Sequence, residues 1–196
     1  MNYETDLQNQ LEFVREVDRL KQVIRRNYLM DGSRAENTAE HSWHAALTAF
    51  ILQEHANQPV DICRVGKMLL IHDVIEVEAG DTYIYDPSAA ADQEERELAA
   101  AHNLFGMLPE GQGSDLLACW LEFEARQTAE ARFAKAIDRF MPMFANYESG
   151  GKSWLEHGIS KARMLEINHI IADGSETLWQ EAQKMIGDAA ERGLLS

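Results

Sequence analysis

The sequence has little of what marks a disulfide-bonded or membrane-spanning protein. It contains two cysteines and four prolines among 196 residues. No stretch approaches the roughly 20 continuous apolar residues that a membrane-spanning helix needs. Cys63 and Cys119 stand in apolar contexts, so we expect free buried thiols, with a single disulfide as the alternative.

Positive charge is also scarce. Lysine and arginine number 18 against 33 aspartates and glutamates, which gives a formal net charge of −15. Long-range repulsion of this sign argues against binding to a nucleic-acid polymer. It leaves room for a small phosphorylated substrate if a bound cation and local arginines reverse the field inside a pocket. The N-terminal segment has no basic region followed by an apolar run, so we expect a cytoplasmic protein.

Apolar residues follow a helical period along most of the chain. Leu7, Leu11 and Val14 begin an amphipathic helix expected over about residues 6–25, followed by a loop. Asn37, with Glu40 three residues later, resembles a capping box that opens a second helix. The apolar residues of that second helix are Trp43, Leu47, Phe50 and Ile51.

The remaining elements are predicted to be helices too. Asp61 is a plausible N-cap for a helix that continues through KMLLIHDVIEV, and a short YIY run in the following polar loop could be extended. Pro142 predicts a kink or break in its helix. Later helices are expected over about residues 91–107, 114–126, 129–147, 153–172 and 176–191. The predicted fold class is therefore all-α, in one compact domain.

Charged residues interrupt two of these apolar faces. His72 and Asp73 lie inside the apolar run LLIHDVI, and Glu76 follows on the same helical face. Burial of an unpaired carboxylate costs on the order of several kcal/mol. Three ionisable groups that converge in this way point to a shared cation.

Asp138 shows the same anomaly within an apolar stripe, and His41 lies in the first turn of its helix. Together His41, His72, Asp73 and Asp138 would offer two imidazole nitrogens and two carboxylates, a set that suits Mn, Fe, Co, Ni or Zn. From the residues alone the alternatives stay open: each histidine could be a hydrogen-bonded core residue, and Asp138 could pair with a buried arginine.

Four segments carry a family resemblance in their order and spacing. They are LKQVIRRNY, ENTAEHSWHAA, IHDVIEVEAGD and AKAIDRFMPMFANY. Together they resemble the HD-domain metal-dependent phosphohydrolases, in the branch that contains the 5′-deoxynucleotidases. The resemblance implies a helical domain over residues 1–196, with a metal-binding core over about 37–147 and C-terminal helices over about 153–191. It also implies one divalent transition metal ion, held by His41, His72, Asp73 and Asp138, and hydrolysis of a phosphate monoester.

The resemblance assigns further positions. Two acidic residues correspond to Glu76 and Asp81, and a substrate-facing arginine corresponds to Arg25, with Arg26 as the alternative. The family often has a tryptophan shortly after this arginine, whereas this chain has Tyr28, which bears on nucleotide recognition.

The roles implied are those of general acid–base chemistry. Glu76 would orient or deprotonate the attacking water, Asp81 would protonate the leaving oxygen, and Arg25 would neutralise the phosphate; the two acids could exchange roles. Glu76 could instead fix a ligand imidazole, Asp81 could be a turn residue or helix cap, and the arginine could be solvated at a helix end.

We therefore expect a nucleoside 5′-monophosphate as substrate. The alternatives are a phosphodiesterase or pyrophosphohydrolase on the same ion, and a non-catalytic metal-stabilised regulatory module. The branch also resembles homodimers. The apolar C-terminal helices, with Trp154, Trp179, Leu194 and Leu195, could supply the interface or could pack within the monomer core.

Overall fold

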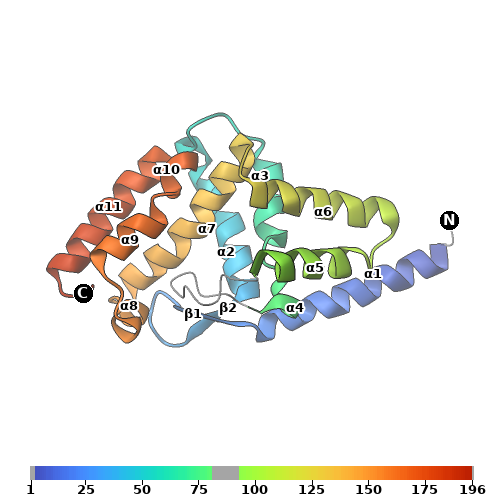
Figure 1. Ribbon diagram of the computed structural model, residues 1–196, viewed down its shortest axis with the longest axis horizontal. Helices are drawn as coiled ribbons and strands as arrows, with labels where there is room; N and C mark the ends of the chain where they lie inside the picture. Colours follow the sequence, from blue (N-terminus) through green and yellow to red (C-terminus); the bar gives the residue numbers. More distant parts are fainter. Residues whose placement is uncertain (1–2, 81–92, 196) are drawn as a thin grey trace.

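The computed structural model describes residues 3–80 and 93–195, and in these ranges it consists of helices and a two-stranded sheet (Figure 1). The all-α fold class is confirmed. Asp81 and the YIY run lie outside the described residues. The elements in chain order are α1 Tyr3–Val17, η1 Asp18–Gln22, β1 Ile24–Tyr28, β2 Ala35–Asn37, α2 Thr38–Leu52, η2 Gln53–His55, α3 Ile62–Ile71, α4 Glu76–Ala79, α5 Gln93–Phe105, α6 Glu110–Ala125, α7 Ala129–Glu148, α8 Lys152–His157, α9 Lys161–Asn168, α10 Ile171–Gly174 and α11 Glu176–Glu191.

The first predicted helix is wrong in its second half. Helix α1 ends at Val17, a 3-10 turn follows, and the chain then forms strand β1. β1 pairs antiparallel with β2, and Ile24 lies opposite Asn37. A strand exposes alternate residues on opposite sides. Arg25 is accordingly half-buried, whereas Ile24 and Arg26 are exposed.

The predicted starts of α2 and α3 are confirmed. The side chain of Asn37 accepts from the Glu40 amide while the Glu40 carboxylate accepts from the Asn37 amide, which completes the capping box. Asp61 caps α3 by accepting from the amides of Cys63 and Arg64. Both caps satisfy amide groups that a helix start leaves unpaired.

Helix α3 is shorter than predicted. It ends at Ile71 instead of running through Val77, and the residues up to α4 form a turn. Within that turn the amides of Val74 and Glu76 bond to carbonyls three residues back, at Ile71 and Asp73. This tightening redirects the chain, so His72 and Asp73 lie just past a helix end.

The second half of the chain also departs from the prediction. Helix α7 runs through Pro142 without a break. The single helix expected over about 153–172 is three short helices, with Gly158 in the left-handed region at φ 61° and Ser160 capping α9. The last helix begins at Glu176, as predicted, and the Ser175 side chain caps it.

Helix α7 lies at the centre of the molecule. It packs against α2, α3, α10 and α11, and Figure 1 shows it between the C-terminal helices and α2. The inner face of α2 is narrow because it carries Ala45, Ala46 and Ala49, all buried. The large apolar residues of α2 named from the sequence, Trp43, Leu47, Phe50 and Ile51, are 44–65% exposed.

Other burial predictions have mixed outcomes. Cys119 is buried and Cys63 is exposed, and both are free thiols, so the disulfide alternative is wrong. Trp154, Trp179 and Leu195 are buried in the core of the monomer. The alternative that they pack within the monomer is therefore confirmed, and an interface built on them is wrong. Among the described helices, none is both long and apolar enough to cross a membrane.

Candidate metal centre

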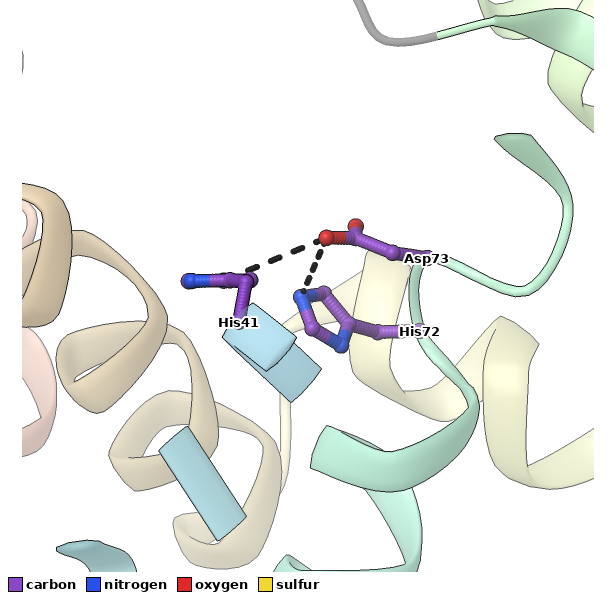
Figure 2. A group of neighbouring side chains, drawn as sticks. All are labelled: His41, His72 and Asp73. Carbon is purple, nitrogen blue, oxygen red and sulfur yellow. Dashed lines mark ion pairs between the residues drawn. The ribbon is translucent and has the colours of Figure 1, made fainter. Parts of the chain in front are cut away.

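Three parts of the fold bring the predicted ligand residues together. His41 stands in the first turn of α2, which the Asn37 cap holds in place. His72 and Asp73 come from the end of α3, and Asp138 comes from the middle of α7. Figure 2 shows His41, His72 and Asp73 directed toward one another.

The ligand atoms lie close to one another. Asp138 Oδ1 is 3.1 Å from His41 Nε2 and 3.3 Å from His72 Nε2. Asp73 Oδ2 is 3.1 Å from His72 Nε2 and 3.9 Å from His41 Nε2. The ligand atoms of His41, His72 and Asp73 all lie within 4.8 Å of one another. His41 Nε2 and His72 Nε2 therefore each lie near one oxygen of Asp138 and one oxygen of Asp73.

The separations of the two imidazole nitrogens from Asp138 Oδ1 are those expected around a divalent ion. With metal–ligand bonds of about 2.1 Å, neighbouring ligand atoms stand about 3.0 Å apart at right angles and about 3.4 Å apart at the tetrahedral angle. The separations of 3.1 and 3.3 Å between the imidazole nitrogens and Asp138 Oδ1 fall between these values. Mixed nitrogen and oxygen donors suit a borderline transition metal better than Ca²⁺ or Mg²⁺.

Burial and charge set different protonation tendencies for the two histidines. Burial lowers the pKa of His41 to about 4, with help from the Arg25 charge, so its imidazole is neutral and able to donate a lone pair. Burial alone would lower the pKa of His72 as well, but Asp73 and Asp138 outweigh it and raise that pKa to about 10. Without a metal, the carboxylates are thus partly neutralised by a proton on His72.

The carboxylates stay ionised despite their burial. Burial alone would raise the pKa of Asp73, but His72 and Arg25 hold it well below its usual range. Burial acts on Asp138 in the same direction, and Lys135 with the two imidazoles keeps the pKa of Asp138 low. Both groups are therefore available as anionic ligands near neutral pH.

Each imidazole also has a neighbour on its other nitrogen. His72 Nδ1 is 2.9 Å from the Leu69 carbonyl oxygen, an acceptor that fixes the ring with Nε2 inward. Trp120 Nε1 donates to the His72 carbonyl oxygen at 3.1 Å. His41 Nδ1 is 3.7 Å from Glu36 Oε2, and burial raises the pKa of Glu36 to about 7.

Arg25 and Glu76 lie beside the ligand cluster. Arg25 Nη1 is 2.8 Å from Asp73 Oδ2 and 3.9 Å from Glu76 Oε1, and its side chain is 12% exposed. The Thr38 hydroxyl donates to Glu76 Oε2 at 2.9 Å, deep in the protein. The structure thus brings Arg25 into the site and leaves Arg26 exposed. Glu36, not Glu76, is the carboxylate beside His41 Nδ1.

Sequence reasoning missed Lys135 and Glu36. Lys135 Nζ is 2.9 Å from Asp138 Oδ2, so the partner of this buried carboxylate is a lysine and not the arginine considered above. The spacing of three residues on one helix could have indicated this pair. No comparable local signal marks Glu36, because its approach to His41 depends on how strand β2 enters α2.

A pocket of about 290 Å³ opens beside His41. Polar groups and apolar side chains both line it, in the mixture common in small-ligand sites. The lining residues are Tyr28, Leu29, Met30, Asp31, Glu36, His41, His44, Met141 and Ala145. Tyr28, which stands where the resembling family often has tryptophan, also donates from its hydroxyl to Glu156 at 3.0 Å.

Fold and site together define an HD-type protein, and the comparisons agree. Residues 17–179 match the family model described as HD domain, and the chain belongs to this family. A crystal structure described as a predicted metal-dependent phosphohydrolase from Magnetospirillum magnetotacticum MS-1 is 46% identical and has a TM-score of 0.94. That similarity covers 100% of this chain and 98% of the other.

Curated relatives are more distant. The 5′-deoxynucleotidase HDDC2 of Bos taurus is 31% identical over 133 residues, which are 67% of this chain and 63% of the relative. The protein of the same name from Homo sapiens is 28% identical over 130 residues, 66% of this chain and 62% of the relative. This chain thus spans less than two thirds of the length of these relatives.

Proposed function

We propose that the chain is a metal-dependent phosphohydrolase that converts nucleoside 5′-monophosphates, deoxyribonucleotides included, to nucleoside and phosphate. The observation that carries this proposal is the approach of two imidazole nitrogens to Asp138 Oδ1 at 3.1 and 3.3 Å, beside Asp73 and Arg25. The similarity to proteins named 5′-deoxynucleotidase supports the substrate class.

His41, His72, Asp73 and Asp138 would hold one divalent transition metal ion, drawn from Co, Mn, Ni, Fe and Zn. Two neutral imidazoles and two carboxylates offset the charge of such an ion. When bound, the ion supplies Lewis acidity toward the phosphate and lowers the pKa of water from about 16 toward neutrality.

The surrounding residues would handle charge and protons. Arg25 would bind a non-bridging phosphate oxygen and neutralise the charge that develops there. Glu76 would accept the proton of the attacking water, with Thr38 fixing Oε2 so that Oε1 stays toward Arg25. Water forms the new P–O bond as the ester P–O bond breaks, and the 5′-oxygen leaves with a proton supplied by Asp81. The two acids could also act in the reverse order.

The pocket beside His41 would receive the nucleoside. Its volume of about 290 Å³ stands at the small end of ligand sites, which run to about 1,000 Å³. Tyr28 offers an aromatic face, while Glu36 and His44 offer hydrogen-bonding groups. A compact monophosphate therefore suits this space better than a polymer.

A phosphate-release screen tests the proposal. The protein is loaded with Co²⁺ or Mn²⁺ and incubated with each ribo- and deoxyribonucleoside 5′-monophosphate. Release from at least one of them, lost in Asp138→Ala, is the expected result. Metal binding without release from any would favour a regulatory module, and release only from diesters or triphosphates would favour the phosphodiesterase or pyrophosphohydrolase alternative.

We also propose that the protein is cytoplasmic and a homodimer joined through the outer face of α2, formed by Trp43, Leu47, Phe50 and Ile51. Monomers rarely expose so many large apolar side chains together. In a chain of net charge −15, two copies repel unless the contact is nearly free of charge, and α2 carries one acidic residue, Glu40. A two-fold contact would place this face against itself.

A further inference from the structure

Lys135 lies one turn before Asp138 on α7 and contacts it directly. Its Nζ is 2.9 Å from Asp138 Oδ2, and its side chain is only 14% exposed. Lysine is seldom buried to this degree without a fixed partner. Besides keeping the pKa of Asp138 low, this cation forms a fixed contact with one oxygen of that carboxylate.

The two oxygens of Asp138 have separate contacts. Oδ1 faces His41 Nε2 and His72 Nε2, whereas Oδ2 faces Lys135. Rotation about the last side-chain bond of an aspartate is soft, so an unrestrained carboxylate samples a broad range of angles. The ammonium of Lys135, bonded to one oxygen, therefore restrains the orientation of the carboxylate with its other oxygen toward the imidazoles.

Lys135 is itself held in place by an aromatic ring. Its Nζ lies 4.7 Å from the centroid of the Phe123 ring, within the range of a cation–π contact. The same ring lies 5.0 Å from the ring of His72. Phe123 thus contacts both a ligand imidazole and the lysine that holds a ligand carboxylate.

We propose that Lys135 is a positioning residue for metal binding, which holds Asp138 with Oδ1 directed at the ion and Oδ2 turned away. This inference rests on the proposed metal site. The Asp138 contact of Nζ and the burial of the side chain distinguish this role from that of a phosphate ligand such as Arg25.

Metal affinity measures the role without relying on turnover. Residues that hold a metal ligand typically contribute about 10- to 100-fold to affinity. We expect Lys135→Met to weaken Co²⁺ binding within that range and to shift the visible absorption spectrum of the bound Co²⁺. Lys135→Arg, which keeps a cationic donor, recovers most of the affinity. Lys135→Gln keeps a neutral hydrogen-bond donor, so its affinity for Co²⁺ should lie between those of the other two variants. It replaces Lys135→Met in the test if the methionine variant does not fold.

A matched control is available on α11. Lys184 pairs with Glu181 at a spacing of three residues, as Lys135 does with Asp138, but its side chain is 73% exposed. Lys184→Met should leave metal affinity unchanged. Far-UV circular dichroism of every variant reports whether its helical fold is retained. A double variant tests whether Lys135 acts through Asp138. In an Asp138→Asn background, Lys135→Met should cause no further loss of metal affinity.

The outcomes separate the two proposals. A wild-type protein that binds neither Co²⁺ nor Mn²⁺ would overturn the proposed function, and the role of Lys135 with it. Wild-type binding with unchanged affinity and spectrum in folded Lys135→Met and Lys135→Gln would overturn only the positioning role. The positioning role would also be overturned if these variants, at saturating metal, raised KM and left kcat and metal affinity unchanged. Lys135 would then be a substrate ligand.

Discussion

Arg25 Nη1 lies 2.8 Å from Asp73 Oδ2 and so joins strand β1 to the end of helix α3 across 48 residues. The same carboxylate oxygen lies 3.1 Å from His72 Nε2. A cation suited to binding phosphate and a candidate metal ligand therefore meet at one atom. Short contacts of this kind bring the proposed phosphate-binding group and the candidate metal ligands into one site.

Removal of the Arg25 guanidinium should reduce catalysis strongly. Loss of one group that stabilises transition-state charge typically costs about 10²- to 10³-fold in kcat. We expect Arg25→Ala to lose activity in that range with the best nucleoside monophosphate. Its control is Arg26→Ala, on the exposed side of the same strand, which should stay near the wild-type rate. Equal losses in the two variants would contradict the assignment of Arg25.

Glu76 should affect turnover more than metal binding. General acid–base residues contribute about 10²- to 10⁴-fold, and we expect Glu76→Gln to lose kcat in that range while it keeps its affinity for Co²⁺. Steady-state phosphate release and calorimetric titration measure the two quantities. A variant that instead lost the metal and kept its turnover per bound ion would place Glu76 among the ligands.

Substitution of Thr38 tests the role of Glu76 with a smaller expected effect on kcat. Its hydroxyl donates to Glu76 Oε2 at 2.9 Å, and a buried hydrogen bond contributes about 1 kcal/mol, or roughly fivefold in rate. Thr38→Val should therefore reduce kcat by about that factor, while Thr38→Ser keeps the hydroxyl and should keep the wild-type kcat. A loss as large as that of Glu76→Gln would show that Thr38 does more than hold this carboxylate.

Metal should stabilise the folded protein, because it joins α2, α3 and α7. At a free metal concentration about 100 times Kd, binding adds about 2.7 kcal/mol to the free energy of unfolding. Thermal unfolding with and without Co²⁺ should show a rise in Tm that a chelator reverses. His72→Ala should lose the response, while His102→Ala, which alters a histidine outside the ligand cluster, should keep it. The same rise in both variants would remove His72 from the site.

The outer face of α2 should control assembly. Ile51 is 65% exposed on that face, and Ile51→Glu would place two like charges against each other in a two-fold contact. We expect sedimentation to show a dimer for the wild-type chain and a monomer for this variant. Leu155→Glu changes an exposed apolar residue elsewhere, on α8, and should leave the dimer intact. A wild-type monomer, or dissociation of both variants, would contradict the proposed interface.

Much of the site could be predicted because its charges interrupt apolar periodicity. His72, Asp73 and Asp138 stood out in this way, and the caps of α2 and α3 followed from local hydrogen-bonding rules. The approach of Asp138 Oδ1 to two imidazoles from other helices is tertiary geometry, which spacing along the chain does not determine.

Other features could not be predicted, for identifiable reasons. Ile24 continues the helical period of α1, whereas in the structure it lies in a strand that pairs with β2, a partner the local pattern does not reveal. The apolar residues of α2 do not by themselves show which side of the helix is buried; its closely packed inner side takes Ala45 and Ala49, and the large side chains stay largely exposed. Lys135 resembles an ordinary solvated lysine until Asp138 and Phe123 are placed around it.

The central claim is one divalent ion held by four residues beside a phosphate-binding arginine. A crystal structure of the Co²⁺-loaded Glu76→Gln protein with a nucleoside monophosphate, with anomalous scattering to locate the metal, tests it most directly. We expect one Co²⁺ per chain, contacted by His41, His72, Asp73 and Asp138, with the phosphate against Arg25. An ion held elsewhere, a second ion in the site, or a phosphate remote from Arg25 would contradict it.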